Sequence, residues 1–330
     1  MTEWTGNYDA VVIGGGAAGL NGALMLARSR RSVLVVDSGA PRNAPAHAVH
    51  GLFARDGVPP RELLRRGREE VRGYGGEIVD GEVTAVARTA DGFAVTLRDG
   101  GTARARRLLV TTGLVDELPD IAGLRERWGR EVVHCPYCHG WEVRDEPIGV
   151  IATGPMSVHG ALLFRQLSAD VVFLVNDLPL GAEQRAELAA RGIEIIEGAV
   201  AALEITDDRL TGVRLADGTV IPRTTVAVAS RMVARTEFLT GLGLTAVAHP
   251  SGMGEHIPAD PTGRTEAPGV WAAGNVTDLS AQVGSAAAAG AMAGGQINAD
   301  LVAEEVREAV AAAGAQVGQP NRGGANATAD

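Results

Sequence analysis

The two cysteines of this 330-residue chain are separated by two residues, in the segment Cys135-Pro136-Tyr137-Cys138-His139. A zinc site of four cysteines is excluded because the chain has no third cysteine, and no closely spaced pair of histidines follows to complete a mixed site. A structural disulfide that closes so short a loop would add little stability. The spacing therefore favours a redox-active dithiol, and we expect no metal ion.

The residue after the second cysteine suggests how the thiols are activated. Thiol chemistry proceeds through the thiolate, and an ordinary thiol, with a pKa of about 8.5, is mostly protonated at neutral pH. Histidine titrates near neutrality, so His139 can take a proton from a thiol and return it later. The alternative is that His139 only fills a polar gap.

A dinucleotide-binding pattern occurs near the N-terminus. Residues 8–39 predict a strand, a helix and a second strand, with the glycines of a Gly-x-Gly-x-x-Gly loop after the first strand. Gly14 permits a tight turn, Gly16 lets the backbone approach a pyrophosphate, and Gly19 lets helix and strand pack closely. Asp37 ends the second strand, where it suits an adenosine ribose. The alternative is a tight turn without a ligand.

A second strand–helix–strand pattern begins at Ile148, directly after the cysteine segment, with altered key positions. Ala152 and Ser157 stand where glycines are expected, and no arginine follows the strand at 171–175 to bind a 2′-phosphate. NADPH is therefore an unlikely cofactor on sequence grounds. The alternative to a nicotinamide site is a Rossmann fold kept only for structure.

The composition sets the broad class of protein. The length fits two domains, and 45% hydrophobic residues with 44 glycines are typical of a glycine-rich α/β protein. A net charge of −10 with scattered basic residues argues against a nucleic-acid partner. A strand that begins by Tyr8 leaves no room for a signal peptide, and no apolar run is long enough to span a membrane. We expect a cytoplasmic protein with no membrane partner.

Three further segments are informative. A predicted buried strand ends in Thr111-Thr112-Gly113, and a later one ends at Asn275. An Ala- and Gly-rich helix is expected from Ser285, where small side chains would permit close packing in the core or across a dimer interface. The tail from about residue 316 is expected to be disordered.

These segments, in this order, resemble the low-molecular-weight thioredoxin reductase family. The resemblance implies an α/β fold with two Rossmann-like, three-layer domains, a bound FAD and a homodimer. It places the FAD domain at residues 1–117 and 247–330, and an inserted Cys-x-x-Cys domain with a degenerate NAD(P)-binding fold at residues 118–246. The residues that it implies for FAD binding are Gly14, Gly16, Ala17, Ala18, Gly19, Asp37, Ser38, Arg42, Asn43, His50, Val83, Thr112, Gly113, Gly274, Asn275, Gln282 and Val283.

The departures from the reductases point to a subgroup. His139 replaces the acid that reductases carry after the second cysteine, and Asn275 replaces an aspartate near the flavin. Cys-Pro-Tyr-Cys-His-Gly-Trp-Glu, together with the motif at 39–43, resembles FAD-dependent dithiol oxidases of gliotoxin, holomycin and related natural products. The resemblance assigns catalysis to Cys135, Cys138 and His139.

The function implied is oxidation of a small-molecule dithiol to an intramolecular disulfide. Electrons would pass through Cys135 and Cys138 to FAD and then to dioxygen, giving hydrogen peroxide. The context would be biosynthesis of, or self-protection against, a dithiolopyrrolone or epidithio product such as holomycin. The alternatives are an NAD(P)H-dependent, thioredoxin-type disulfide reductase and a flavin-binding redox sensor.

Overall fold

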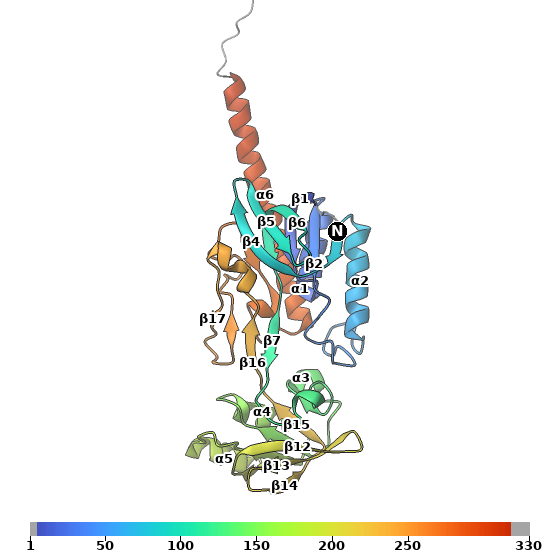
Figure 1. The fold of residues 1–330 in the computed structure, drawn as a ribbon, viewed down its shortest axis with the longest axis vertical. Helices are drawn as coiled ribbons and strands as arrows, with labels where there is room; N and C mark the ends of the chain where they lie inside the picture. Colours follow the sequence, from blue (N-terminus) through green and yellow to red (C-terminus); the bar gives the residue numbers. More distant parts are fainter. Residues whose placement is uncertain (1–4, 318–330) are drawn as a thin grey trace, which may run out of the picture.

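The computed structural model describes residues 5–317 and consists of two α/β units joined by a pair of strands (Figure 1). The larger unit holds both ends of the described chain, and the other unit is inserted into it. From residue 318 on, the tail that was expected to be disordered lies outside the described residues. Residues 316–317, which were included in that tail, belong to helix α6 (Val283–Val317).

The larger unit is built on a seven-stranded sheet whose central strands are buried on both faces. The strand order is β3-β2-β1-β6-β5-β4, and β19 pairs with β6. Residues Ala10 to Ile13 of β1 are at most 3% exposed, as expected for a parallel strand covered on both sides. The strands are β1 (Thr5–Ile13), β2 (Val33–Asp37), β3 (Glu77–Asp80), β4 (Val83–Thr89), β5 (Gly92–Leu97), β6 (Thr102–Val110) and β19 (Val270–Ala272).

Helices α1 (Ala17–Arg28) and α6 pack closely against each other through glycine. A Cβ atom on Gly290 of α6 would lie 1.9 Å from the carbonyl oxygen of Ala18. This backbone contact holds α6 against the helix that follows the glycine loop. Helix α2 (Pro60–Gly73) lies beside α1 and begins with a proline, which suits the first helical turn.

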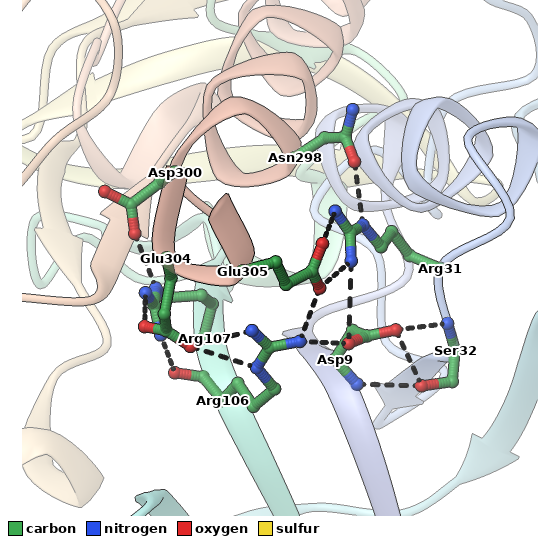
Figure 2. Close-up of polar contacts among 9 residues, drawn as sticks. All are labelled: Asp9, Arg31, Ser32, Arg106, Arg107, Asn298, Asp300, Glu304 and Glu305. Atoms are coloured by element: carbon green, nitrogen blue, oxygen red, sulfur yellow. Dashed lines mark hydrogen bonds and ion pairs between the residues drawn. The ribbon is translucent and has the colours of Figure 1, made fainter. Parts of the chain in front are cut away.

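The C-terminal half of α6 extends beyond the body of the larger unit (Figure 1) and is attached by ion pairs. Three arginines, one from the turn after α1 and two from the middle of β6, bind carboxylates of α6 and of β1 (Figure 2). The arginines are Arg31, Arg106 and Arg107, and their partners are Asp9, Asp300, Glu304 and Glu305. In the described part of the chain, no helix is both long and apolar enough to cross a membrane.

The inserted unit confirms the second Rossmann-like pattern. Its five-stranded sheet has the order β11-β10-β9-β15-β8, and a three-stranded sheet, β12-β13-β14, packs beside it. The elements are β8 (Val132–Val133), α3 (Pro136–His139), β9 (Ile148–Ile151), α4 (Ser157–Phe164), β10 (Val171–Leu174), α5 (Ala182–Ala190), β11 (Glu194–Ile196), β12 (Val200–Thr206), β13 (Arg209–Leu215), β14 (Val220–Pro222) and β15 (Thr225–Val228). Helix α3 lies on the side of this unit that faces the larger one (Figure 1).

The two connecting segments form an antiparallel pair, β7 (Leu114–Glu117) with β16 (Arg231–Ala234). After β16 the chain returns at once to the larger unit, because Phe238 and Leu239 of the 3-10 helix η2 (Glu237–Leu242) lie in that unit's core. The second domain boundary therefore lies before Glu237, and the sequence-based boundary at residue 246 was wrong. The remaining short elements are η1 (Arg125–Arg127), β17 (Val247–Ala248), β18 (Glu255–His256) and η3 (Gly274–Val276).

Candidate active site

One large cavity, of about 1140 Å³, lies between the two units and is lined by both. It contains the glycine loop, the end of β2, the turn after β6 and the start of α6, together with the cysteine segment. All of the predicted catalytic residues and all but one of the predicted FAD-binding residues line it. These are Cys135, Cys138 and His139, with Gly14, Gly16, Ala17, Ala18, Asp37, Ser38, Arg42, Asn43, His50, Val83, Thr112, Gly113, Gly274, Asn275, Gln282 and Val283.

Gly19 is the exception, because it does not line the cavity. It is buried in α1, and a Cβ atom there would lie 1.9 Å from the carbonyl oxygen of Gly14 and 2.6 Å from Thr111 Oγ1. Gly19 therefore lets helix and loop pack closely, as the motif predicts, without lining the cavity.

The glycine loop has one tightly packed side and one open side. Gly14 has a φ of 108°, and a Cβ atom there would lie 2.4 Å from the carbonyl oxygen of Thr111. A Cβ atom on Gly16 would meet nothing within 4 Å, and Gly16 caps α1 without a side-chain hydrogen bond. The first N–H groups of α1 thus border an open cradle, which is the arrangement that binds phosphate at a helix N-terminus.

Asp37 lies beside this cradle. Its Oδ1 accepts a hydrogen bond from the Gly15 N–H at 3.1 Å, and its other oxygen pairs with Arg68 of α2. At the far side, Asn275 Nδ2 donates to the Ala281 carbonyl at 2.9 Å and shapes the turn before α6. The cavity is larger than a typical drug-sized pocket, and its open cradle fits the pyrophosphate of a dinucleotide such as FAD.

The two cysteines lie at the start of α3, with Cys135 as the N-cap residue. Both thiols are free and partly buried, and the Cys138 thiol donates a hydrogen bond to Cys135 Sγ at 2.9 Å. This bond lowers the pKa of Cys135 and raises the pKa of Cys138. Cys135 is therefore the sulfur that carries the negative charge in the dithiol state.

His139 presents an unsatisfied nitrogen. Its Nε2 atom is buried and has no hydrogen-bond partner within the described residues. Burial lowers the pKa of His139, and the nearby Glu142 carboxylate partly opposes this effect. The imidazole is therefore neutral at neutral pH and can accept a proton, which a base beside the cysteines requires.

Arg42 and His50 line the cavity, but their polar atoms are bound to protein groups. Arg42 forms two hydrogen bonds of 2.7 Å with Asp116 of β7. The Nε2 atom of His50 lies 3.3 Å from Glu142 Oε1. Both contacts join the larger unit to the segments around the cysteines. Asp116 and Glu142 were not identified from the sequence, because their partners are far away along the chain and no motif marks them.

The second glycine-like loop is closed by its own side chain. Ser157 Oγ accepts hydrogen bonds from the N–H groups of Thr153 at 3.0 Å and Gly154 at 3.2 Å. Asn176, after β10, donates to the Ala152 carbonyl at 3.1 Å. Backbone groups that would face a pyrophosphate in an intact site are therefore already paired.

One wall of the cavity was not predicted at all. Met156, His159 and Leu163, around the first turns of α4, line the cavity together with Tyr137 of the cysteine segment. Their spacing of three and four residues places them on one face of the helix. That periodicity is visible in the sequence, but only the packing of α3 on α4 shows which way the face points.

Comparison with known proteins agrees with this geometry. The chain matches the pyridine nucleotide-disulphide oxidoreductase family over residues 8–295. Thioredoxin reductase tcpT of Claviceps purpurea is 31% identical over 315 residues, which cover 90% of this chain and 95% of that protein. A probable thioredoxin reductase of Arthroderma benhamiae is 34% identical over 176 residues, 51% of this chain, and the match spans only 44% of that protein.

A solved structure gives a stronger match. The crystal structure of HlmI superposes with a TM-score of 0.88 at 50% sequence identity, covering 94% of this chain and 98% of that one. The chain therefore belongs to the pyridine nucleotide-disulphide oxidoreductase family and has the two-unit α/β fold of the low-molecular-weight thioredoxin reductases.

Proposed function

We propose that the protein is an FAD-dependent dithiol oxidase that converts a small-molecule dithiol into an intramolecular disulfide and passes the electrons to dioxygen. The observation that carries this proposal is the contrast between two loops: the glycine loop at Gly16 is open, and the second loop is closed by Ser157. The cradle at Gly16 shares its cavity with Cys135 and Cys138, whereas Ser157 occupies the amides of the second loop. This contrast supports a flavin site beside the dithiol and an electron source other than a pyridine nucleotide.

The residues of the chain account for the thiol steps. A substrate thiolate attacks Cys135 in the enzyme disulfide, which breaks the Cys135–Cys138 bond, releases Cys138 as a thiolate and forms a mixed disulfide. The second substrate thiol then attacks the substrate sulfur of this mixed disulfide and displaces Cys135 as the product ring closes. The hydrogen bond from Cys138 stabilises the released Cys135 thiolate. His139 Nε2 takes the proton of the attacking thiol. Two electrons and two protons leave the substrate in each turnover.

Reoxidation of the dithiol completes the cycle. When bound, FAD supplies a two-electron acceptor that dioxygen can reoxidise with release of hydrogen peroxide. Cys135 and Cys138 then form the disulfide again. The similarity to HlmI and the resemblance of the cysteine segment to gliotoxin- and holomycin-type oxidases support a dithiolopyrrolone or epidithio substrate, in biosynthesis or self-protection.

An anaerobic titration of the purified yellow protein tests the proposal. We expect stoichiometric small dithiols to bleach the flavin absorbance and NADPH to leave it unchanged. Admission of air should restore the colour and release one peroxide for each dithiol consumed. In Cys138→Ser, bound flavin should remain while dithiol-dependent bleaching is lost. Rapid bleaching by stoichiometric NADPH would instead identify a reductase, the activity for which several relatives are named.

A further inference from the structure

The loop between β2 and α2, residues 38–59, contacts the connecting strand β7 at one place and the inserted unit at two others. Arg42 binds Asp116 on the connecting strand β7. Pro45 lies against Gly129, where a Cβ atom would be only 2.6 Å from Pro45 Cβ. The third contact is the pair between His50 and Glu142. Because residues 129 and 142 lie on either side of the cysteine pair in the sequence, this loop brackets the dithiol segment.

The contact at Asp116 is the best defined of the three. Arg42 donates from Nε and Nη2 to the two carboxylate oxygens, both at 2.7 Å, in the bidentate geometry that gives the strongest ion pairs. Ser230 Oγ donates to Asp116 Oδ1 at 2.6 Å. The Asp116 side chain is only 9% exposed. One carboxylate therefore joins the β2–α2 loop to both connecting segments, since Ser230 directly precedes β16.

The electrostatics of Asp116 agree with a strong pair. Burial alone would raise the pKa of this carboxyl, but the hydrogen bonds from Arg42 and Ser230 outweigh burial and lower it. Loss of Arg42 would leave the Asp116 carboxylate without a compensating charge in a nearly buried position, which is costly. The pair is thus well placed to set the relative orientation of the two units, together with the strand pair β7–β16 and the loop contacts at Gly129 and Glu142.

We infer that Arg42 is a positioning residue, which holds the inserted unit in the orientation that opens Cys135 and Cys138 into the cavity of the glycine loop. The effect of Arg42 on turnover rests on the proposed function, whereas the Arg42–Asp116 ion pair is independent of it. In the proposed oxidase, electrons enter at the cysteines and leave through the flavin site in the same cavity. One orientation of the two units therefore serves both halves of the cycle. The Arg42–Asp116 pair stabilises that orientation.

Arg42 also acts on the thiols by charge, and the two effects need separate variants. The Arg42 guanidinium lowers the pKa of both cysteines. Arg42→Lys keeps the positive charge and loses the bidentate pair. Asp116→Asn keeps the shape and loses the pair. Arg42→Gln removes both the charge and the pair.

Arg231→Gln is a matched control. It breaks the ion pairs of Arg231 with Glu117, at 2.6 Å across the same two strands, and with Glu255, and neither partner belongs to the β2–α2 loop. The side chains of Arg231 and Glu117 are about half exposed. An exposed pair of this kind contributes little.

The test compares two alkylating reagents on the reduced protein at one pH. Iodoacetamide enters the cavity and reports the thiolate fraction, whereas a polyethylene-glycol maleimide needs the units to separate. The ratio of the maleimide rate to the iodoacetamide rate cancels the thiolate fraction. We expect Arg42→Gln, Arg42→Lys and Asp116→Asn to raise this ratio about tenfold or more, and Arg231→Gln to leave it at the wild-type value.

Wild-type ratios in Asp116→Asn and Arg42→Lys would overturn the inference and leave Arg42 with a purely electrostatic effect. If Arg42→Gln does not fold, the isosteric Asp116→Asn variant decides the question, with circular dichroism confirming its fold. Neither reagent reports flavin reduction or turnover. Failure of the dithiol titration would therefore refute the proposed function without changing the result for Arg42.

Discussion

The chemistry of the cysteine pair is set by groups of its own segment and of the β2–α2 loop. Cys135 receives a hydrogen bond from Cys138, and His139 follows on the same short helix with a free ring nitrogen. The groups that surround the imidazole are Glu142 from its own segment and His47 and His50 from the β2–α2 loop. Of these, only Glu142 raises the pKa of His139, and burial lowers it further than Glu142 raises it.

This balance gives a pH dependence for dithiol oxidation. Because the folded pKa of His139 lies below the ordinary histidine value of about 6.5, the basic form persists to lower pH than in a free imidazole. The midpoint of the acid limb of the kcat/KM profile should therefore lie below pH 6.5. His139→Gln should lose the limb and reduce kcat/KM by about 10²–10⁴-fold, the usual contribution of a general base. A retained limb in His139→Gln would assign the proton to another group.

At this scale, sequence reasoning succeeded where chemistry is local. Gly16, Asp37 and the cysteine segment were identified because each belongs to a motif whose members are close along the chain. Asp116 and the Ser157 hydroxyl were missed in their roles because their partners come from other segments or from backbone amides. No local pattern specifies such contacts.

Among the elements, the α1–α6 contact decides how the glycine loop is supported. The backbone of α6 lies so close to α1 that a side chain at Gly290 has no space. Gly295, five residues further along the same helix, has open space around its Cβ position. The two glycines therefore have opposite consequences for stability.

Substitution by alanine separates these two cases. We expect Gly290→Ala to lower the free energy of unfolding by about 1–3 kcal/mol through overpacking, with partial loss of bound flavin. Gly295→Ala should raise it by about 0.5–1 kcal/mol, because alanine favours helix. Urea unfolding followed by circular dichroism measures both. Equal effects of the two substitutions would show that the close contact contributes nothing.

The helices and strands were largely predictable from the sequence, and their assignment to one or the other unit was less so. Both strand–helix–strand units were visible because buried strands read as short apolar runs that end in small or polar residues. The boundary near η2 was missed because a 3-10 helix of six residues has too few turns to show periodicity. Its membership of the larger unit became clear only from Phe238 and Leu239 in that core.

For the whole molecule, the arginine cluster around α6 (Figure 2) makes stability depend on acid. Hydrogen bonds from Arg31 and Arg106 lower the pKa of Glu305 to about 2, and the Arg107 hydrogen bond lowers the pKa of Glu304. A carboxyl with a depressed folded pKa stabilises the fold above its unfolded pKa, about 4.3, and the contribution disappears as the pH falls towards the folded pKa.

The double variant Glu304→Gln/Glu305→Gln should therefore flatten the loss of unfolding free energy between about pH 4 and pH 2. At neutral pH it should be less stable than the wild type. Glu308→Gln serves as the control, because Glu308 forms no ion pair among residues 5–317. Thermal unfolding at a series of pH values measures the slopes, and parallel slopes for all three proteins would contradict the assignment.

The shared cavity has a consequence for the order of events in catalysis. Cys135 and the glycine cradle open into the same space, so in the proposed oxidase the dithiol, its product and the oxidant would all use a single chamber. A product that still fills the chamber blocks access of dioxygen to the reduced centre, and it must depart before the second half of the cycle begins. Under the proposed function, turnover would then alternate between two substrates that do not occupy the protein together, and slow release of the product would limit the rate.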